Sequence, residues 1–578
     1  MTARPIRRRA VSPVTSTVSG VHPVLARVYH GRGITQNAEL SLGLEGLLPI
    51  GSLDGIESGV ALLEAHMRAN SFVLVVGDFD ADGATASALV VRALRRFGHA
   101  QVDFLVPDRF RFGYGLTPEI VALVASSERL PQLIITVDNG VSSHDGVAAA
   151  RALGIDVLVT DHHLPADTLP QANAIVNPNL GSARFGSRAL AGVGVAFYLM
   201  LALGKRLRVP NALTTELLDL VALGTVADVV PLDRNNRILV QAGLQRIRKG
   251  ACVPGISALL QLASRRQSDV VSSDLGFAIG PRLNAAGRMD NMKIGIECLL
   301  ADDAATAFAL AEQLDRINRD RRTIESDMQA DALSLVERLR ASATATEGDL
   351  PAALCLYDET WHMGVVGLVA SRVKEQVHRV VVAFAPAEDG LARGSARSVP
   401  GIHVRDALEA VATRTPGLIE KFGGHAMAAG LTIRVSRLKE FASALAKEVA
   451  TRAEPGMLDG ILYSDGALML ADLGLELAEA LRAGGPWGSG FPEPAFDGEF
   501  IVVEARVLAE KHLKLWVRLA KDALPQEAIA FGWMARPGAR APRVGVSLRL
   551  LYRLDVNEYQ GVRRAQLLVD HLEEVSSS

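Results

Sequence analysis

Residues 75–89, "VVGDFDADGATASAL", decide the fold because they join a strand to a helix through three aspartates. The aliphatic run that precedes them, residues 71–76 ("SFVLVV"), is typical of a buried strand, and the Ala- and Leu-rich run that follows predicts a helix. Asp78, Asp80 and Asp82 stand at every second position, where an extended backbone points side chains to one side. The turn can therefore present three carboxylates to one side of a sheet.

An alternative interpretation is a calcium loop of the EF-hand type, which begins with the same spacing of aspartates and a glycine. Two features of the sequence exclude it. Position twelve of such a loop carries a bidentate glutamate, and the count from Asp78 places Leu89 there. The loop is also entered from a helix, whereas the run that precedes Asp78 predicts a strand. The aspartates therefore belong to a strand-to-helix turn, where open α/β sheets bind ligands.

The alternation of strands and helices continues beyond this turn. Further strands are expected within residues 101–107, 130–140, 154–163 and 173–178, with helical segments between them. Such alternation implies right-handed crossovers and a mostly parallel sheet. Residues 190–265 have a predominantly helical pattern, and residues 301–340 predict one long helix with interleaved charges. A second α/β unit follows, and from residue 496 onward closely spaced strands predict a small β-barrel.

Length and composition limit the class of protein. A chain of 578 residues exceeds a single core, so three or four domains are expected. The three cysteines are far apart and lack metal spacing, which is typical of a reduced, cytoplasmic protein without disulfides. No apolar region follows the basic N-terminus, so a secretory signal is not expected, and the longest apolar stretch, residues 193–204, is too short for a bilayer. The net charge of −3 neither indicates nor excludes a nucleic-acid partner.

Acidic and imidazole side chains follow three of the expected strands. Asp138 follows one strand, Asp161, His162 and His163 follow the next, and Asp228 is a further candidate. Because the carboxyl ends of parallel strands meet at one edge of a sheet, we expect these groups to lie close to the three aspartates of the first turn. Carboxylates and imidazoles without thiolates suit Mn²⁺ or Mg²⁺, and shared carboxylates can hold two ions about 3.5–4 Å apart. One aspartate after a strand is often only a helix N-cap, but several together favour a two-ion site.

Four segments are similar to the four motifs of the DHH phosphoesterases, namely "DFDADG" (78–83), "VDNG" (137–140), "TDHH" (160–163) and "GTVADVVPL" (224–232). Two further segments resemble the accessory DHHA1 domain of that superfamily, namely "GSARS" (394–398) and "GGHAMAAG" (423–430). Within the superfamily, the chain resembles the RecJ family of bacterial single-strand exonucleases through "RFRFGYGL" (109–116), "GPRLNAAGRM" (280–289) and "WHMGVVGLVASRV" (361–373). It departs from the family pattern at Phe79, where the family has Tyr, and at Phe491, where the family has Asn.

The resemblance implies a division of roles among the acidic and imidazole groups. It implies that two Mn²⁺ or Mg²⁺ ions are bound by five residues, namely Asp80, Asp82, Asp138, His162 and Asp228. It implies that Asp78 and His163 are catalytic residues, which orient ligands or contact the scissile phosphate. It also implies nine substrate-binding residues, namely Arg109, Tyr114, Arg282, Asn284, Ser395, Arg397, Gly423, Gly424 and His425.

The two Gly-rich motifs also have an interpretation from their residues. Glycine lets a backbone approach a ligand closely, and a hydroxyl beside an arginine fork suits phosphate, so both motifs are expected to act as phosphate-binding loops. An ordinary Gly-rich turn is the alternative for each. Arginines that alternate with aromatics in residues 109–116 are typical of single-strand binding, although at least one of Phe110 and Phe112 is expected in the core.

The expected barrel has the composition of an OB-fold that binds single strands. Residues 501–564 contain 12 Arg and Lys against 6 Asp and Glu. Five aromatics lie among them: Trp516, Phe531, Trp533, Tyr552 and Tyr559. About half of these aromatics are expected to belong to the barrel core instead.

The sequence predicts an α/β protein with a parallel-sheet DHH domain, a second α/β DHHA1 domain joined by a long helix, and a C-terminal OB-like β-barrel. The expected boundaries are an irregular segment over residues 1–50, the DHH domain over 51–300, the connecting helix and linker over 301–345, the DHHA1 domain over 346–455 and the barrel domain over 456–578.

The resemblance implies a metal-dependent exonuclease that hydrolyses single-stranded DNA from the 5′ end to 5′-mononucleotides, in DNA repair and recombination. The resemblance also implies single-strand-binding protein and a helicase as further partners. It implies no association with a membrane. One alternative is another DHH enzyme with a small substrate, such as an oligoribonuclease, a cyclic-dinucleotide phosphodiesterase or a pyrophosphatase, and the barrel argues against it. A second alternative is a non-catalytic DNA-binding scaffold, and the complete set of candidate ligands argues against that.

Overall fold

The computed structural model describes residues 4–10, 17–181, 184–343, 350–536 and 538–575, without the side chains of residues 109, 110, 342 and 343. The chain divides into two compact units. The larger unit contains Arg9–Asn318 and Asp465–Ser578, and the smaller contains Met1–Arg8 and Arg319–Ser464. The long helix α15 (Ala304–Ala343) passes from the larger unit into the smaller.

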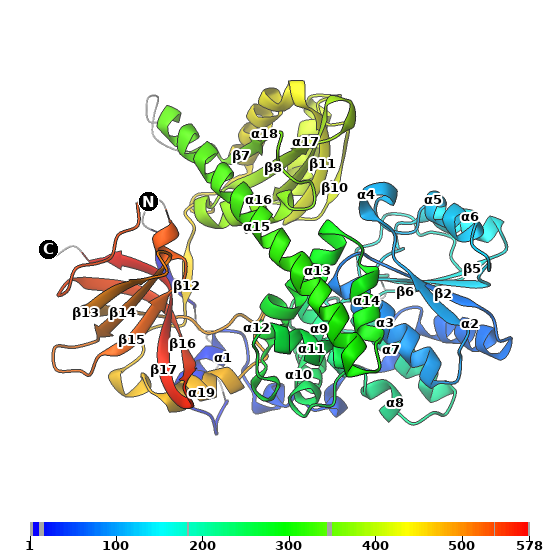
Figure 1. Cartoon of the computed structure of the whole chain (residues 1–578), viewed down its shortest axis with the longest axis horizontal. Helices are drawn as coiled ribbons and strands as arrows, with labels where there is room; N and C mark the ends of the chain where they lie inside the picture. The colour runs from blue at the N-terminus through cyan, green and yellow to red at the C-terminus, as the bar shows by residue number, and fades with distance from the viewer. Residues whose placement is uncertain (1–3, 11–16, 182–183, 344–349, 537, 576–578) are drawn as a thin grey trace. The chain divides into compact units, whose positions relative to one another are not determined.

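A five-stranded parallel sheet in the order β3-β2-β4-β5-β6 forms the centre of the larger unit (Figure 1). Its strands are β2 (Val73–Gly77), β3 (Val102–Leu105), β4 (Leu133–Val137), β5 (Asp156–Thr160) and β6 (Ala174–Val176). All residues of β2 and β4 are buried, because a parallel sheet is covered by helices on both faces. The strands and the parallel order predicted from the sequence are confirmed.

Helices cover the two faces of this sheet, and alternate residues of each strand point to opposite layers. Val73 and Val75 of β2 join the core beneath α3 (Ala81–Arg96) and α7 (Gly192–Arg206), whereas Leu74 and Val76 pack with α5 (Pro118–Ala125) and α6 (His144–Ala152). The remaining helices of the unit are α1 (Pro23–His30), α2 (Ile56–Arg68), α4 (Arg109–Phe112), α8 (Ala212–Thr215), α9 (Leu218–Ala227), α10 (Arg234–Arg248), α11 (Pro254–Leu262), α12 (Ser272–Asp274), α13 (Gly280–Met289), α14 (Lys293–Leu300) and α19 (Leu475–Ala483).

The C-terminal strands close into a barrel in the order β13-β14-β15-β17-β16 (Figure 1). They are β13 (Phe496–Leu508), β14 (His512–Arg518), β15 (Gln526–Ala530), β16 (Ser547–Tyr559) and β17 (Val562–Glu574). Alternate residues of β14 are buried, as expected for a strand with one face toward the barrel interior. The predicted β-barrel is confirmed, and the barrel core is continuous with the core of the sheet domain through residues such as Phe491 and Phe496.

The smaller unit holds a second five-stranded sheet in the order β10-β11-β9-β8-β7. Its strands are β7 (Ala353–Tyr357), β8 (Val380–Pro386), β9 (Leu391–Arg397), β10 (Lys421–Gly424) and β11 (Ala428–Arg434), with helices α16 (Val366–Val377), α17 (Val404–Arg414) and α18 (Leu438–Arg452). Only β7 and β8 are parallel, and the other pairs are antiparallel. The short strands β1 (Ile6–Arg8) and β12 (Leu462–Ser464) pair in parallel.

The N-terminal segment differs from the irregular chain that the sequence predicted over residues 1–50. It contains the helix α1, whose residues Val24, Leu25, Val28 and Tyr29 are buried, together with strand β1. Tertiary packing stabilises this short helix, because the Tyr29 ring stacks on Trp487 and Phe491, more than 450 residues away in sequence.

Among the residues that the structure describes, no single helix is long and apolar enough to cross a membrane. One bent pair, Leu44–Ser52 followed by Ile56–Arg68, meets the criterion by length and composition.

Candidate metal centre

Three aspartates follow adjacent strands of the parallel sheet. Asp78 follows β2, Asp138 follows β4 and Asp161 follows β5, and these strands are neighbours in the order β2-β4-β5. All three side chains are buried, with exposed fractions of 7%, 2% and 1%. The sheet therefore gathers the carboxylates at the edge where the sequence placed them.

The two other aspartates of the first turn are held by helix N-termini. Asp80 is the N-cap of α3, and its Oδ1 accepts hydrogen bonds from the backbone N–H groups of Asp82 and Gly83 at 2.9 and 3.0 Å. The carboxylate of Asp82 accepts hydrogen bonds from the N–H groups of Gly192 and Val193 at 2.6 and 3.0 Å, at the start of α7. Free N–H groups at helix N-termini favour negative charge, so both carboxylates have a fixed position.

One glycine permits the close approach of α7 to the site. A Cβ atom added to Gly192 would lie 2.6 Å from the Cβ of Asp138 and 2.7 Å from its Oδ1. Since Cβ atoms do not approach other heavy atoms so closely, any other residue would displace Asp138 or the start of α7. The glycine thus allows a helix N-terminus and a strand-end carboxylate to share one small volume.

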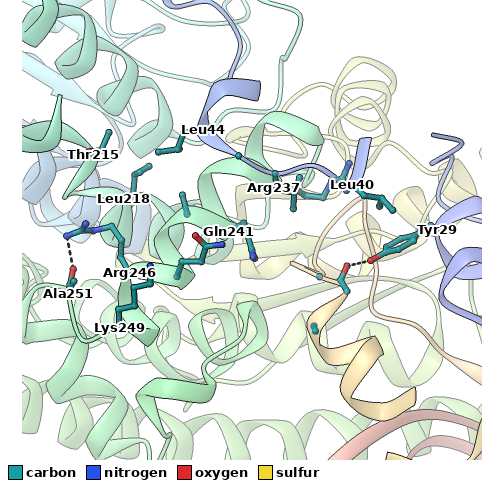
Figure 2. A pocket seen from close by; sticks show the side chains of 17 residues that line it. Tyr29, Leu40, Leu44, Thr215, Leu218, Arg237, Gln241, Arg246, Lys249 and Ala251 are labelled. Atoms are coloured by element: carbon teal, nitrogen blue, oxygen red, sulfur yellow. Dashed lines mark hydrogen bonds between the residues drawn. The ribbon is translucent and has the colours of Figure 1, made fainter. Parts of the chain in front are cut away.

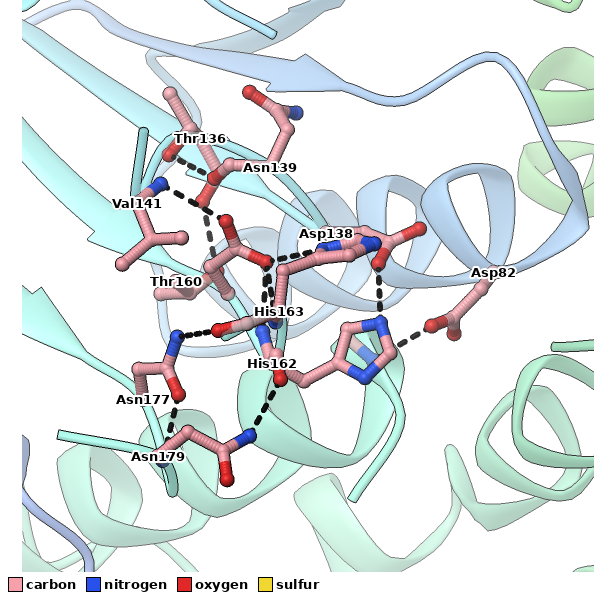
Figure 3. Close-up of polar contacts among 12 residues, drawn as sticks. Asp82, Thr136, Asp138, Asn139, Val141, Thr160, His162, His163, Asn177 and Asn179 are labelled. Atoms are coloured by element: carbon pink, nitrogen blue, oxygen red, sulfur yellow. Dashed lines mark hydrogen bonds and ion pairs between the residues drawn. The ribbon is translucent and has the colours of Figure 1, made fainter. Parts of the chain in front are cut away.

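Three buried polar atoms converge between the strand ends without a hydrogen-bond partner among the described residues. They are Asp138 Oδ1, His162 Nε2 and Asp228 Oδ2. His162 Nε2 lies 3.1 Å from Asp138 Oδ1 and 3.5 Å from Asp228 Oδ2. Figure 3 shows the His162 ring directed toward Asp138, with its backbone fixed from the other side. Buried polar atoms normally have partners, so this set fits a cation that its oxygen and nitrogen atoms would bind.

The acidic and imidazole groups form three overlapping sets that could each hold a metal ion, with ligand atoms within 4.8 Å of one another. The sets are Asp82, His162 and Asp228; Asp78, Asp80 and Asp138; and Asp138, His162 and His163. Asp138 and His162 each belong to two sets, as expected for ligands shared between neighbouring ions. Asp78 lies within a potential ligand set, so the geometry is compatible with metal binding by Asp78 itself.

Asp161 fixes both histidines of the third motif. Its Oδ1 accepts hydrogen bonds from the backbone N–H groups of His162 and His163, at 2.7 and 3.1 Å, and lies 2.7 Å from His163 Nδ1. Its Oδ2 accepts a hydrogen bond from the N–H of Val141 at 2.9 Å. A carboxylate in this position sets the tautomer and orientation of the imidazole.

Two asparagines hold the backbone of the same motif from the other side. Asn177 donates to the carbonyl oxygen of His163 at 2.9 Å, and Asn179 donates to that of His162 at 2.7 Å (Figure 3). Neither asparagine was predicted as part of the site. The only sequence signal for them is their position at the end of the expected strand segment 173–178 or just beyond it, which is too weak to separate them from an ordinary loop.

The electrostatics of the cluster favour a bound cation. Burial, followed by the charge of Asp80, raises the pKa of Asp82 to about 7. Burial and the neighbouring aspartates raise the pKa of Asp138 and that of Asp228 well above the usual range of a carboxyl group. These carboxylates cannot all be ionised cheaply at neutral pH unless positive charge is placed among them.

The two histidines have opposite protonation tendencies. Burial, followed by the charge of His163, lowers the pKa of His162 to about 4, so its ring is neutral at neutral pH and can offer Nε2 as a ligand. For His163, burial lowers the pKa, but the hydrogen bond and charge of Asp161 outweigh burial and the net shift is upward.

Backbone strain is concentrated at two positions of the site. Asp138 has φ of 63° and Val229, which follows Asp228, also has φ of 63°. A β-branched residue with positive φ is rare, and such strain is common at functional sites. Asp228 itself stands at the C-terminal end of α9, within the segment that the sequence predicted to be helical, so the fourth acidic signal comes from a helix end.

The predicted substrate-binding residues of the larger unit make different contacts. The Tyr114 hydroxyl lies 3.2 Å from the carbonyl oxygen of Asp138 and 3.2 Å from His163 Nδ1, and the residue is 49% exposed at the rim of the cluster. Arg282 forms an ion pair with Asp315 at 2.9 Å. Asn284 accepts a hydrogen bond from the N–H of Ala81 at 2.8 Å, which fixes the aspartate turn. The side chain of Arg109 lies outside the described part of the chain.

The Gly-rich motifs of the smaller unit are strands, and not the loops that the sequence predicted. Gly394–Arg397 belongs to β9, whereas Gly423 and Gly424 belong to β10, which pairs with β11. In β9, Arg397 Nη1 donates to Ser395 Oγ at 2.8 Å. His425 follows β10, and its N–H donates to the carbonyl oxygen of Ala428 at 2.8 Å in the hairpin turn. Gly423 and Gly430 border open space, whereas a Cβ atom at Gly394 would collide with the Phe384 ring. A pattern of Gly and Ser does not distinguish such a strand from a turn.

Two exposed apolar side chains near Asp228 were not predicted as site residues. Phe277 is 80% exposed and lies in a short π-helix (Leu275–Ile279), and Val229 is 66% exposed. Both line a groove of about 860 Å³ in the larger unit, between the helical layer and the barrel. π-helical turns occur frequently at functional sites, and no sequence pattern indicated one here.

Comparison with known families and proteins identifies this arrangement. Three family models match the chain: the N-terminal domain of the DHH family over residues 72–225, the DHHA1 domain over residues 350–451 and the RecJ OB domain over residues 464–571. The single-stranded-DNA-specific exonuclease RecJ of Escherichia coli is 49% identical over 579 residues, which cover 98% of each chain. This chain belongs to the RecJ family.

The relatives extend across distant bacteria and include solved structures. The single-stranded-DNA-specific exonucleases RecJ of Bacillus subtilis and Thermus thermophilus are 32% and 35% identical, over 89% and 85% of this chain and 63% and 68% of their own lengths. The crystal structure of RecJ from Thermus thermophilus in complex with Mn²⁺ superposes with a TM-score of 0.78 at 31% identity, over 96% of this chain and 76% of that one. The crystal structure of the same enzyme in complex with Mg²⁺ gives a TM-score of 0.73 at 29% identity, over 96% of this chain and 75% of that one.

Proposed function

We propose that the chain is a metal-dependent exonuclease that hydrolyses single-stranded DNA. The observation that carries the proposal is the convergence of Asp138 Oδ1, His162 Nε2 and Asp228 Oδ2, three buried ligand atoms without a hydrogen-bond partner among the described residues. Membership of the RecJ family supports the substrate, because curated relatives of the same length carry that activity in their names. The sequence alternatives, a small-substrate enzyme and a scaffold without activity, have no comparable support.

The ligand set fits Mn²⁺ or Mg²⁺, and the residues that would hold two ions are Asp80, Asp82, Asp138, His162 and Asp228, with Asp78 at the same edge. When bound, such ions supply an activated water and positive charge for the phosphate oxygens. Asp161 holds His163 by a 2.7 Å contact, so that its ring stays beside the Tyr114 hydroxyl at the rim. We assign to His163 and Tyr114 the task of contacting and orienting the scissile phosphate.

The groove beside Asp228 would receive the bases of the strand. Phe277 offers an exposed ring, and Val229 continues the apolar surface up to the ligand Asp228. Aromatic faces bind unpaired bases without regard to sequence, whereas paired bases have no free face to offer. This surface therefore supports selection of single strands over duplex.

The barrel would hold the strand further from the reacting phosphate. Phe531 and Tyr559 are 62% and 71% exposed, and the half-buried Trp516 lies against Arg506 and Lys514, whose charged groups are 5.4 and 4.8 Å from its ring centroid. Trp533 and Tyr552 are buried, in agreement with the expectation that about half of the aromatics belong to the core. Exposed rings among cations are the combination by which OB-folds bind single strands.

The polarity and biological setting belong to the same proposal. We assign recognition of the 5′ end to Ser395 and Arg397 of the smaller unit, and we propose that hydrolysis proceeds from that end and releases 5′-mononucleotides. Gly423, Gly424 and His425 would let a phosphate approach the neighbouring strand. A role in DNA repair and recombination in the cytoplasm, with single-strand-binding protein and a helicase as partners, follows from family resemblance.

Digestion of labelled single strands tests the proposal. One oligonucleotide carries its label at the 5′ end and a matched one at the 3′ end, and each is incubated with Mn²⁺ or with a chelator. The proposal predicts immediate release of a labelled mononucleotide from the 5′-labelled strand, progressive shortening of the 3′-labelled strand, and no cleavage in chelator. Metal-independent cleavage, or equal cleavage of a duplex with blunt ends, would contradict it.

A further inference from the structure

A second pocket of the larger unit lies on α10 and has no part in the metal centre. Its volume is about 540 Å³, and three separate segments line it: residues 29–44, residues 215–251 and residues 483–485 (Figure 2). Along α10, Arg237, Gln241 and Gln245 stand four residues apart and therefore share one face. Arg246 and Lys249 continue the lining toward Ala251. This assembly is called the α10 pocket below.

The α10 pocket contains a buried positive charge without a countercharge. Arg237 is only 4% exposed, yet it makes no hydrogen bond or ion pair with any described residue. Its guanidinium lies 4.3 Å from the centroid of the Phe491 ring. That contact covers one face of the group but leaves its in-plane N–H donors free. Charged side chains are rarely buried unless they are paired, so the donors of Arg237 indicate a missing anionic partner.

Two further cations increase the positive charge of the pocket. Arg246 donates to the carbonyl oxygen of Ala251 at 2.8 Å, but its Nε is buried without a partner. Lys249 is exposed and forms no ion pair within the described part of the chain. None of the described lining residues is acidic. Asp233 and Glu39 act on Arg237 only through space, and burial lowers the pKa of Arg237.

The groove beside Phe277 differs from the α10 pocket in the charges of its lining residues. That groove also contains arginines, but Asp274, Glu493, Asp555 and Asp570 line it as well, and Arg553 is paired with Glu493 and Asp570. Several of its cations are therefore paired with acids of the same lining. In the α10 pocket none of the described lining residues is acidic, although buried Asp219 lies close enough to Arg246 to interact with its charge. A lining of cations without acids is the composition of an oxyanion site.

The other lining residues of the α10 pocket indicate a ligand larger than a simple inorganic ion. The volume lies within the range of about 300–1,000 Å³ that is typical of small-molecule sites. Leu40, Leu42 and Leu218 supply an apolar wall, and Gln241 and Gln245 supply amides that can both donate and accept hydrogen bonds. An oxyanion attached to a flat group with hydrogen-bonding edges satisfies all three parts of the lining.

We propose that the α10 pocket binds a nucleotide through its phosphate, as a free mononucleotide or as a phosphate of the bound single strand. The choice of nucleotide rests on the proposed function, because a single-strand exonuclease works among strands and mononucleotides. Arg246 and Lys249, which lie within one turn of each other at the end of α10, hold the phosphate oxygens, and the two glutamines face the base. Arg237 lies at the other end of the pocket, about 13.5 Å from Arg246 along the helix axis. Occupation would join the N-terminal segment, α10 and the chain that leads to the barrel.

Calorimetric titration of the full chain tests this site separately from catalysis. The titrations use a chelator, so that no divalent ion is present, and four probes: deoxyadenosine monophosphate, deoxyadenosine, inorganic phosphate and an oligothymidylate. The variants are the double change Arg246→Gln with Lys249→Met, and Arg237→Met. Lys205→Met, an exposed lysine on α7 outside the pocket, serves as the matched control. Since Arg237 is buried, the double change keeps the test valid if Arg237→Met fails to fold.

The proposal predicts saturable binding of deoxyadenosine monophosphate, weaker binding of inorganic phosphate and no binding of deoxyadenosine. The double change should weaken nucleotide binding roughly tenfold to a hundredfold, the effect of losing hydrogen bonds to a charged group, while Lys205→Met leaves it unchanged. If the strand is the source of the phosphate, the double change also weakens oligothymidylate binding. If the free mononucleotide is the source, oligothymidylate binding is unaltered.

Three outcomes would overturn the inference. They are equal nucleotide binding by the unaltered chain and the double variant, deoxyadenosine binding as tight as that of its monophosphate, and no saturable binding at millimolar concentration. None of them bears on the proposed function, which the digestion of labelled strands by the unaltered chain tests independently.

Discussion

The edge of the parallel sheet and the barrel differ in how they use polar and apolar groups. At the sheet edge, Asp138 and His162 place ligand atoms 3.1 Å apart in a buried volume, where neither has a hydrogen-bond partner among the described residues, and Asp138 has a strained backbone. In the barrel the strands pair around a closed ring, and Phe531 and Tyr559 reach solvent from its surface. The metal chemistry therefore depends on buried ligand atoms without hydrogen bonds among the described residues, whereas strand binding depends on exposed rings that the barrel carries.

The largest expected effect separates turnover from binding. His162→Ala or Asp138→Ala should lower cleavage of a single strand by more than about a hundredfold, since even groups that only support metal ligands contribute 10- to 100-fold. Affinity for an oligonucleotide, measured in chelator, should be unchanged because the barrel is intact. The matched control is Asp145→Ala, an exposed aspartate at the start of α6. Normal turnover in either ligand variant would refute the metal assignment.

A smaller effect is expected at the proposed 5′-phosphate site of the smaller unit. Arg397→Ala should weaken use of a 5′-phosphorylated strand by about 1.5–3 kcal/mol, or roughly tenfold to a hundredfold, through loss of a charge-assisted hydrogen bond. Arg397→Lys should also be impaired, because lysine lacks the planar fork that can bond two oxygens while it contacts Ser395. The check is the ratio of rates on 5′-phosphorylated and 5′-hydroxyl strands. An equal loss on both would assign Arg397 to an internal phosphate or to the fold.

Exposed aromatics of the groove and the barrel should change affinity more than turnover. Phe277→Ala, or Phe531→Ala in the barrel, should weaken oligonucleotide binding by about 1–3 kcal/mol, the contribution of one base stacked on an aromatic ring. Leu524→Ala is the control, since Leu524 is 81% exposed and does not line the groove. Fluorescence anisotropy in chelator gives the affinities. If Phe277→Ala binds normally, the strand does not use the groove.

Deletion of the barrel would be a poorer test of the same point. The barrel core is continuous with the core of the sheet domain, and Phe491 stacks between this region and Tyr29 of α1. Truncation would therefore expose apolar surface in the domain that remains. Substitution of single exposed rings avoids this loss of stability.

The smallest effect concerns stability without metal. Asp138→Asn removes the charge of a buried carboxylate whose Oδ1 has no hydrogen-bond partner among the described residues and lies 3.1 Å from the neutral ring of His162. Asparagine tolerates the positive φ at this position. At pH 7.5 in chelator the variant should be more stable by on the order of 1 kcal/mol.

The pH dependence of this gain follows from the raised pKa of Asp138. Asp138 costs stability only at pH values above its pKa in the unfolded chain, so the gain should vanish near pH 3. Urea unfolding at both pH values provides the measurement. A variant that is less stable than the native chain at pH 7.5 would show that the carboxylate has a partner within the protein.

Sequence patterns predicted those parts of the molecule whose geometry depends on neighbouring residues. Asp78 and Asp138 could be placed at one edge because strand ends in a parallel sheet are adjacent by topology, and the five barrel strands followed from their spacing. Side-chain partners remote in sequence could not be predicted. The ion pair of Arg282 with Asp315 and the contact of Asn284 with Ala81 depend on how α13 packs, and no local pattern encodes that packing.

Errors of secondary structure had a similar origin. Ser395 and Gly423 were expected in loops, because glycine and serine favour turns, but strand pairing with β11 determines their conformation. Helix α1 depends on distant aromatics, and the exposed Phe277 depends on a π-helical turn that no periodicity indicates. In each case tertiary contacts outweighed local preference.

Anomalous scattering from crystals soaked in Mn²⁺ tests the central claim most directly, because it locates the ions independently of activity. We expect two peaks at the carboxyl edge of the sheet, with Asp138 and His162 among the ligands, and a crystal of Asp138→Ala should lose occupancy at one or both. Absence of any peak at this edge at saturating Mn²⁺, or strong peaks only elsewhere in the molecule, would contradict it.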